Sequence, residues 1–216
     1  MKSLNQYIQE KLIINKNYKE VNIVVKSGDE LRKIIKDRYD KLGEGTEQKP
    51  IDFNDIDVSN LDSFCNSEYT GIFENINFKY IDISDWDVSN IKSIRCMFWD
   101  CKELESVGDI SEWDVSNVID MNRMFYNCKA LKTVGDISKW DVSKVTNMGS
   151  MFLNCNFFNQ DISGWDVSNV TDMSSMFGGC KKFNQDISKW DVSKVRYKID
   201  MFDNCPIKEE YKPKFN

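Results

Sequence analysis

A phrase of 25 to 30 residues occurs six times between residues 51 and 205, and it restricts the possible folds more than any other feature of the chain. The consensus is D-I-S-x-W-D-V-S-[NK]-V-x-x-M-x-x-M-F-x-x-C. The Asp of Asp-Val-Ser marks each copy: Asp57, Asp87, Asp114, Asp141, Asp166 and Asp191. A unit of this length cannot bury its apolar side chains alone, so we expect the copies to stack as rungs that share one core.

The apolar period changes in the middle of each copy. In the copy at 161–180, Ile162, Trp165 and Val167 follow the L-x-x-L-x-L spacing of a leucine-rich-repeat strand. Apolar residues then follow at steps of three and four, which is the spacing of one helix face. We therefore predict a strand over 161–167, a turn at Ser168 and a helical return over 170–180. The predicted fold class is α/β, a leucine-rich-repeat-like right-handed solenoid with one short parallel strand and one helical turn per rung.

Three segments follow from the pattern: a helical N-terminal cap at 1–50, a six-repeat solenoid at 51–205 and a polar C-terminal tail at 206–216. Within the cap, a helix is predicted over 3–14 and a short strand over 21–25. Ser27 and Glu30 have the spacing of a capping box that begins a second helix, and Gly43 is suited to end it. We expect this cap to cover the open end of the first repeat.

Charge and composition exclude several classes of protein. The net charge is −6, and residues 51–216 carry 18 Lys and Arg against 27 Asp and Glu. Such an acidic body repels nucleic acid. There is no histidine, the commonest general base and metal ligand. No apolar run is long enough to insert into a membrane, and the start does not resemble a signal peptide. The expected location is cytoplasmic or virion-associated, or the cell surface if a signal was removed.

One cysteine column and a methionine–phenylalanine stripe are predicted to be buried. The column consists of Cys101, Cys128, Cys155, Cys180 and Cys205. The first repeat has Ile76 at this position, which favours a small buried side chain over a reactive thiol. No Cys-x-x-Cys motif or Cys/His cluster is present, so we expect no metal site, no cofactor and no catalytic residue.

Two aspartate ladders recur in every inner copy. One contains Asp82, Asp109, Asp136, Asp161 and Asp186, and the other contains Asp57 and its five equivalents. Like charges stacked about 5 Å apart repel, so turn N–H groups, serine hydroxyls, lysines or a cation must offset the repulsion. We expect one ladder to bind turn N–H groups and the other to line the exposed sheet. Calcium binding along a ladder is an open alternative.

The repeat resembles that of BspA-type leucine-rich-repeat proteins, which is also found in Mycoplasma lipoproteins. The shared words are D-I-S-x-W-D-V-S-N-V and M-x-x-M-F-x-x-C, over about residues 51–205. The resemblance implies a non-enzymatic binding protein of a bacterium or its phage, often a surface adhesin. The start, MKSLNQYIQE, is similar to the capsid-targeting peptides of phage internal head proteins, with a possible cleavage site at Ile8-Gln9-Glu10.

The predicted function is therefore binding of a protein or glycan partner on the strand face of the solenoid. Candidate contact residues are those that differ between copies at the x position and at the strand exit: Asp85, Glu112, Lys139, Gly164 and Lys189, with Asn90, Asn117, Lys144, Asn169 and Lys194. Two alternatives are a structural or packaged component of a phage particle and, less favoured, a carbohydrate-active enzyme. Every Asp in the middle copies is a consensus position, whereas an active site would need a locally unusual cluster.

Overall fold

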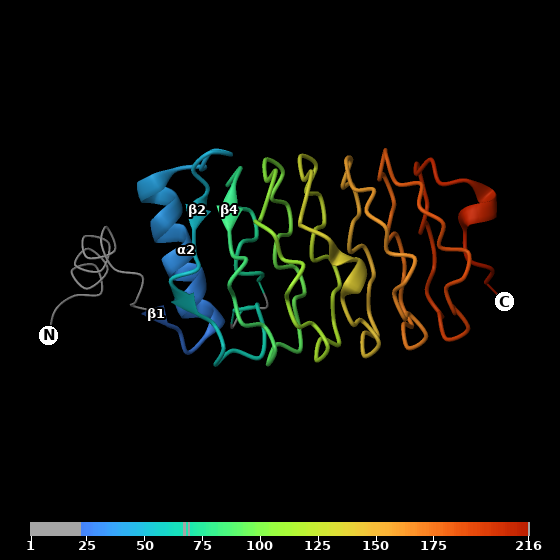
Figure 1. The fold of residues 1–216 in the computed structure, drawn as a ribbon, viewed down its shortest axis with the longest axis horizontal. Helices are drawn as coiled ribbons and strands as arrows, with labels where there is room; N and C mark the ends of the chain where they lie inside the picture. Colours follow the sequence, from blue (N-terminus) through green and yellow to red (C-terminus); the bar gives the residue numbers. More distant parts are fainter. Residues whose placement is uncertain (1–22, 67, 69, 216) are drawn as a thin grey trace, which may run out of the picture.

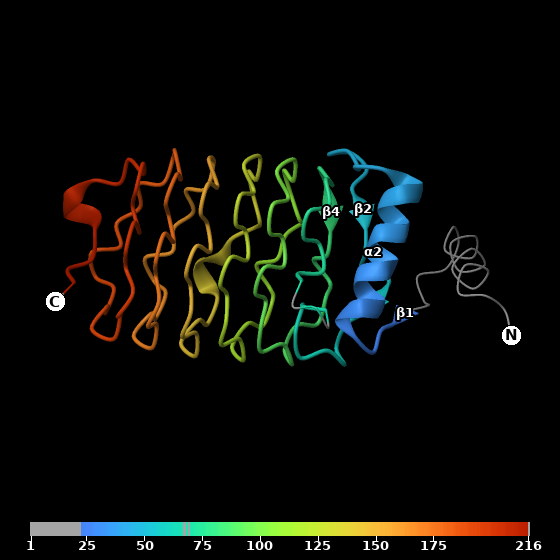
Figure 2. The ribbon, with the colours of Figure 1, turned by 180° about the vertical axis from the view of Figure 1, so that it is seen from behind.

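The computed structural model describes residues 23–66, 68 and 70–215, and it shows the repeats lying one after another along a long axis (Figures 1 and 2). The elements are β1 (Ile23–Val24), α2 (Gly28–Leu42), β2 (Ile51–Asp52), β3 (Ile56–Asp57), β4 (Ile81–Asp82) and the 3-10 turns η1 (Ile137–Lys139) and η2 (Glu209–Tyr211). The helix predicted over 3–14 and the candidate targeting peptide lie outside the described residues.

Helix α2 begins and ends where the sequence predicts. The Ser27 hydroxyl accepts a hydrogen bond from the Glu30 N–H at 3.2 Å. Gly43 follows the helix with φ +75°, and its N–H donates to the Tyr39 carbonyl at 2.8 Å. A positive φ disfavours a side chain, which explains the glycine. The predicted second helix of the cap is confirmed.

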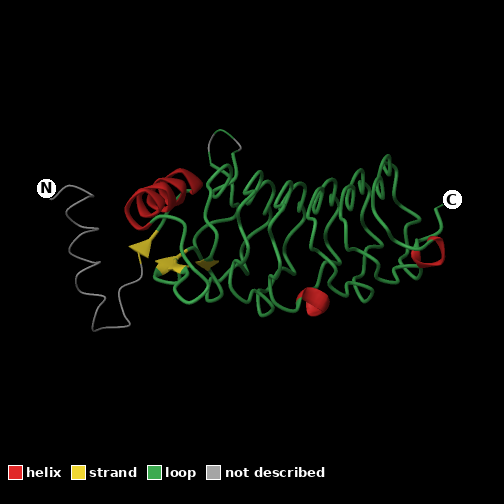
Figure 3. Cartoon of the chain, turned by 90° about the horizontal axis from the view of Figure 1, so that it is seen from above, coloured by secondary structure: helices red, strands yellow, loops and turns green. Residues whose placement is uncertain are grey.

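Strand β1 and helix α2 lie against the first repeat at one end of the molecule (Figure 3). Strand β1 pairs in parallel with β3, in the register Ile23↔Ile56, and β2 pairs in parallel with β4. Leu31, Ile34 and Ile35 form the buried stripe of α2. The helix thus covers apolar side chains of the first repeat that would otherwise meet water.

The second half of each repeat is a series of turns, so the predicted helical return over 170–180 is wrong. The N–H of Phe152 donates to the carbonyl of Met176 in the next rung at 3.0 Å. The N–H of Leu153 donates to the carbonyl of Ser150, three residues before it, at 3.2 Å. Ser150 and Asn154 have φ of +56° and +61°. An α-helix requires negative φ and bonds to the residue four before, so this backbone cannot be helical.

The first half of the inner repeats is more irregular than predicted. After β4, the described part of the chain contains isolated parallel bridges in place of strands, and residues 161–167 carry no strand. One series of these bridges joins Ser63, Ser93, Asp120, Asn147, Asp172 and Tyr197, one residue from each repeat. Successive repeats are therefore in register, although the contacts are too short to form a continuous sheet.

The core consists of identical side chains stacked along the axis. Phe98 and Phe125 stack at 5.2 Å, and Phe152 lies 5.8 Å from Phe125 and 6.0 Å from Phe177. All four rings are fully buried, as are the adjacent methionines. The predicted burial of the methionine–phenylalanine stripe is confirmed.

Each inner tryptophan makes a polar contact that the sequence pattern does not reveal. Its ring is buried, and its Nε1–H donates to a backbone carbonyl of the preceding rung, as from Trp140 to Ile110 at 3.1 Å. Trp165 donates in the same way to Ile137 at 2.9 Å. Because a buried N–H needs an acceptor, the tryptophan both fills the core and ties adjacent rungs together.

Candidate functional site

The two aspartate ladders have the same role, which corrects the prediction that one would line an exposed sheet. The Oδ1 atom of Asp136 accepts from the Ser138 N–H at 3.0 Å, and Oδ1 of Asp141 accepts from the Ser143 N–H at the same distance. The equivalent bond recurs throughout both ladders. Each Asp therefore closes a tight turn with the residue two positions later, a habitual use of Asp before Ser.

In five of these aspartates the turn bonds favour the ionised carboxylate. Hydrogen bonds from the serine side chain, and then from the serine N–H, lower the pKa of five of these aspartates below the usual range. The five are Asp87, Asp136, Asp141, Asp186 and Asp191. They are exposed, so this side of the molecule presents fixed negative charge.

The x positions form a column between the two ladders, and all of them are exposed. We call this column with its flanking aspartates the acidic face; its x residues are Asp85, Glu112, Lys139, Gly164 and Lys189. The x residues are acidic in the earlier rungs and basic or neutral in the later ones. The structure thus brings the predicted contact residues to one surface where their charge varies along the axis.

The strand-exit positions are exposed but also hold the rungs together. The Asn117 amide donates to the Ser89 carbonyl of the preceding rung at 2.8 Å, and Lys144 Nζ donates to Asn117 Oδ1 at 2.8 Å. Lys194 makes the same contact with Asn169 at 2.6 Å. Half of the predicted contact residues, namely Asn90, Asn117, Lys144, Asn169 and Lys194, therefore also have a structural role.

A second variable column was missed by the sequence analysis. Trp99, Tyr126 and Leu153 occupy the residue after the buried Phe and are only partly buried. The rings of Trp99 and Tyr126 meet edge to face at 5.7 Å, and the Arg123 guanidinium lies 5.5 Å from the centre of the Trp99 ring. The residue type at this position differs between repeats, and this variation could have indicated an exposed site. It was overlooked because the neighbouring positions belong to the repeated apolar stripe. We call these four residues the aromatic patch.

The cysteine column from Cys101 to Cys180 is buried in the core. Cys128 and Cys155 are fully buried, and their Sγ atoms donate to Phe98 and Phe125 carbonyls of the preceding rung at 3.1 and 3.0 Å. Burial raises the pKa of the Cys101 thiol to about 12. Among the described residues, no three His, Cys, Asp or Glu side chains gather as metal ligands would, and no helix is long and apolar enough to cross a membrane.

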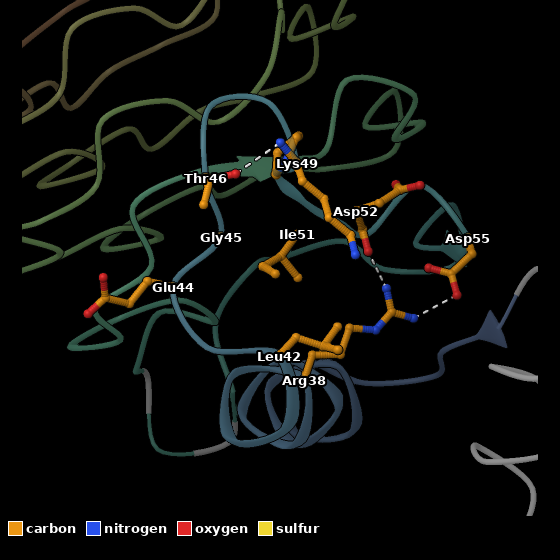
Figure 4. A pocket seen from close by; sticks show the side chains of 10 residues that line it. Arg38, Leu42, Glu44, Gly45, Thr46, Lys49, Ile51, Asp52 and Asp55 are labelled. Atoms are coloured by element: carbon orange, nitrogen blue, oxygen red, sulfur yellow. Dashed lines mark hydrogen bonds and ion pairs between the residues drawn. The ribbon is translucent and has the colours of Figure 1, made fainter.

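A cavity of about 760 Å³ lies between the end of α2 and strand β2 (Figure 4). Arg38 reaches into it from the helix, but its guanidinium already donates to the Asp52 carbonyl and forms an ion pair with Asp55 at 2.6 Å. Leu42 and Ile51 supply apolar walls. The Arg38 guanidinium thus holds the helix on the first repeat and is already paired within the protein.

The in-register bridges, the repeated core columns and the repeated turns define a repeat protein. The chain belongs to the family described as Mycoplasma protein of unknown function, DUF285, which matches residues 46–134 and 130–211. The expected likeness to a Mycoplasma repeat family is thus confirmed at that level. No curated protein and no solved structure matches the chain.

Proposed function

We propose that the chain is a leucine-rich-repeat-like solenoid that acts as a non-catalytic module for binding a macromolecular partner. The observation that carries this proposal is the contrast within each rung. Buried residues such as Trp140 and Phe152 are repeated almost unchanged, whereas exposed residues such as Glu112 and Lys139 change from rung to rung. A rigid framework with variable exposed positions is the usual construction of a recognition surface on stacked repeats.

The acidic face suits a basic partner. Asp136 and Asp141 flank Lys139, and their lowered pKa keeps both charged even under mildly acidic conditions. The earlier rungs add Asp85 and Glu112 at the x positions. Complementary charge increases association rates and selects partners, while rim charges alone add little affinity. We therefore propose a protein surface with clustered Lys or Arg as the partner.

The aromatic patch supplies the residue types that dominate binding energy at protein interfaces. Trp, Tyr and Arg are the commonest hot-spot residues, and Trp99, Tyr126 and Arg123 lie together on adjacent rungs. The resemblance to BspA-type proteins, whose members are often adhesins, supports binding as the role. In this proposal the acidic face selects the partner and the aromatic patch strengthens the complex.

Affinity capture from a host extract with matched charge variants tests the proposal. The bait is the immobilised full chain, and captured proteins are quantified by mass spectrometry. The Asp85→Lys/Glu112→Lys double variant alters the acidic face, and the control Glu209→Lys/Glu210→Lys makes the same charge change in the C-terminal tail, where both glutamates are exposed. We expect the first variant to capture at least fivefold less of each specific partner protein, and the control variant to capture unchanged amounts. Equal retention by both variants would contradict a role for the acidic face.

A Trp99→Ala/Tyr126→Ala variant tests the aromatic patch separately. We expect this variant to capture smaller amounts of the same proteins, without changing which proteins bind. Far-ultraviolet circular dichroism of each variant checks that the fold is intact. If neither the aromatic nor the acidic variant changed the amount of captured protein, binding through the acidic face and the aromatic patch would be refuted.

A further inference from the structure

The backbone ladder between rungs is polar: its N–H groups point toward the C-terminal end and its carbonyls toward the N-terminal end. In one column each N–H donates to a carbonyl of the next rung at 2.9–3.0 Å. The donors are Phe98, Phe125, Phe152 and Phe177, and their acceptors are Met124, Met151, Met176 and Met201, respectively. Each acceptor carbonyl belongs to the peptide group whose N–H is the next donor. The peptide dipoles in such a column therefore add, as they do in an α-helix.

Three more columns run in the same direction beside it. They pass through the N–H groups of Met148, Ser150 and Asn154, which donate to Asp172, Ser174 and Gly178 at 2.9, 2.7 and 2.7 Å. One neighbouring column, through Thr146 and Thr171, runs the opposite way. A second reversed column joins Lys132, Glu105, Lys79 and Glu44 in the first rungs. Among the columns that reach the last rung, four run forward and one is reversed, which leaves a net excess of N–H donors at the C-terminal end. Strand dipoles in ordinary sheets largely cancel.

The fold covers the carbonyl end of this ladder. Arg32 of α2 donates to the carbonyls of Ile72 and Glu74 at 3.1 and 3.0 Å, which begin two of the columns, and it also contacts the Gly71 carbonyl. The Cys65 thiol donates to the Arg95 carbonyl, the start of a third column, at 3.3 Å. A cation at the carbonyl end is the favourable arrangement for aligned peptide dipoles.

At the donor end the C-terminal tail packs on side chains of the last rung, with Lys212 Nζ 5.5 Å from the centre of the Phe202 ring, but in the described part of the chain it supplies no acceptor to the ends of three columns. Three of the columns end at the N–H groups of Asp200, Phe202 and Asn204, and within residues 23–66, 68 and 70–215 none of these three has an acceptor. The tail bonds elsewhere on the last rung, through the Tyr211 carbonyl, which accepts from Ile187 at 3.0 Å. A row of backbone donors is thus left at the edge.

Apolar side chains beside this edge show that it is suited to a covering segment. Tyr197 and Ile199 are 63% and 72% exposed, more than any other large apolar side chain described. Their equivalents in the preceding rung are Asp172 and Ser174, and the inner rungs have polar residues or glycine at both positions. The end of a repeat array normally carries polar residues, so exposed apolar residues here indicate an interaction site.

We propose that this edge, which we call the donor edge, binds an extended, acidic segment of a partner protein. The segment's carbonyls would accept the three free N–H groups, as in strand addition to a sheet edge. Residues 181–216 contain nine Lys and Arg against six Asp and Glu, whereas residues 51–180 contain nine against 21. The donor edge thus lies in the basic part of the chain, with Arg196 as an exposed cation beside it, although the edge itself also carries the exposed carboxylates of Asp200 and Asp203.

A second copy of the chain does not fit this edge. Two donor edges facing each other would place N–H groups against N–H groups. A head-to-tail contact would need the carbonyl end of another copy, which α2 and Arg32 already cover. The partner must therefore bring its own free acceptors, which favours a different protein.

The test uses the full chain and a defined peptide probe. The probe is a fluorescein-labelled ten-residue peptide that alternates Glu with Val and Ile, and the comparison peptide has Lys in place of Glu. Ile199→Ser alters the donor edge, and Ile119→Ser is the matched control because Ile119 is also exposed, at 45%, on a middle rung. Fluorescence anisotropy measures both affinities.

We expect the acidic peptide to bind at least tenfold more tightly than the lysine peptide. Ile199→Ser and Arg196→Gln should each lower the affinity for the acidic peptide about tenfold, and Ile119→Ser should lower it less than twofold. In the ¹⁵N-labelled chain, binding should move the amide signals of Asp200, Phe202 and Asn204. Absence of binding, equal binding of both peptides, or equal effects of the two serine variants would overturn the proposal. The acidic-face variants leave this edge intact, so either proposal can fail without the other.

Discussion

Replacement of Phe152 by Ala measures how much the central aromatic column contributes to stability. The ring is fully buried and lies 5.8 Å from Phe125, 6.0 Å from Phe177 and 3.8 Å from Phe158, measured between ring centroids. Truncation of a buried Phe to Ala costs about 3–5 kcal/mol through lost burial and the cavity left behind. Stacked aromatic pairs add about 0.5–1.5 kcal/mol, so we expect the upper part of that range.

The matched control is Phe157→Ala. Phe157 is 41% exposed, and its one described ring contact is with Lys182 Nζ at 4.9 Å. Surface truncations usually change the free energy of unfolding by less than about 1 kcal/mol. Urea denaturation followed by tryptophan fluorescence gives both values. If Phe152→Ala cost no more than Phe157→Ala, the reasoning about a packed column of rings would be refuted.

Three further predictions follow from the polar contacts of the rungs. Hydrogen bonds lower the pKa of Asp87, Asp141 and Asp191 below the unfolded value of about 3.9, so their stabilisation is present above that pH. The free energy of unfolding should therefore fall as the pH drops from about 5 to 2, and a flat urea midpoint over this range would contradict the turn bonds. Trp140→Phe removes the donor to the Ile110 carbonyl and should cost about 1–3 kcal/mol in urea unfolding; a neutral effect would mean that water replaces the bond. Because burial raises the pKa of the Cys128 thiol, a thiol reagent at pH 8 should leave it unmodified in the native chain and modify all seven cysteines in urea; rapid native reaction of the whole column would disprove its burial.

The core was predictable from the sequence because burial depends on residue type and spacing. The stripe through Met151 and Phe152, the buried cysteines of the inner repeats and the helix that begins after Ser27 all follow from patterns that recur or have strong local preferences. Cys205, in the last repeat, was predicted to be buried but is only partly so, because no further rung follows it in the described chain. The same spacing misled the prediction of the helical return. Steps of three and four place side chains on one face of a helix, and a chain of turns with positive φ at Ser150 and Asn154 places them on one face as well.

The surface was less predictable because its geometry depends on contacts between rungs. The sequence placed Glu112 and Lys139 on an exposed column, as the structure shows, but it could not reveal that Asn117 and Lys144 bond to each other. The donor edge was not predictable, because its direction depends on which backbone group faces the next rung. A repeated pattern identifies the positions that are equivalent, while hydrogen bonding determines what those positions present.

Amide hydrogen exchange at the phenylalanine column tests the stacked, polar ladder most directly. The N–H groups of Phe98, Phe125, Phe152 and Phe177 each donate to the next rung, whereas that of Phe202 ends the column among the described residues. In an NMR exchange experiment on the free chain, the first four amides should be strongly protected and the Phe202 amide should exchange quickly. Protection of Phe202 equal to that of Phe177 would contradict an open donor edge, and rapid exchange at Phe125 and Phe152 would contradict the stacking itself.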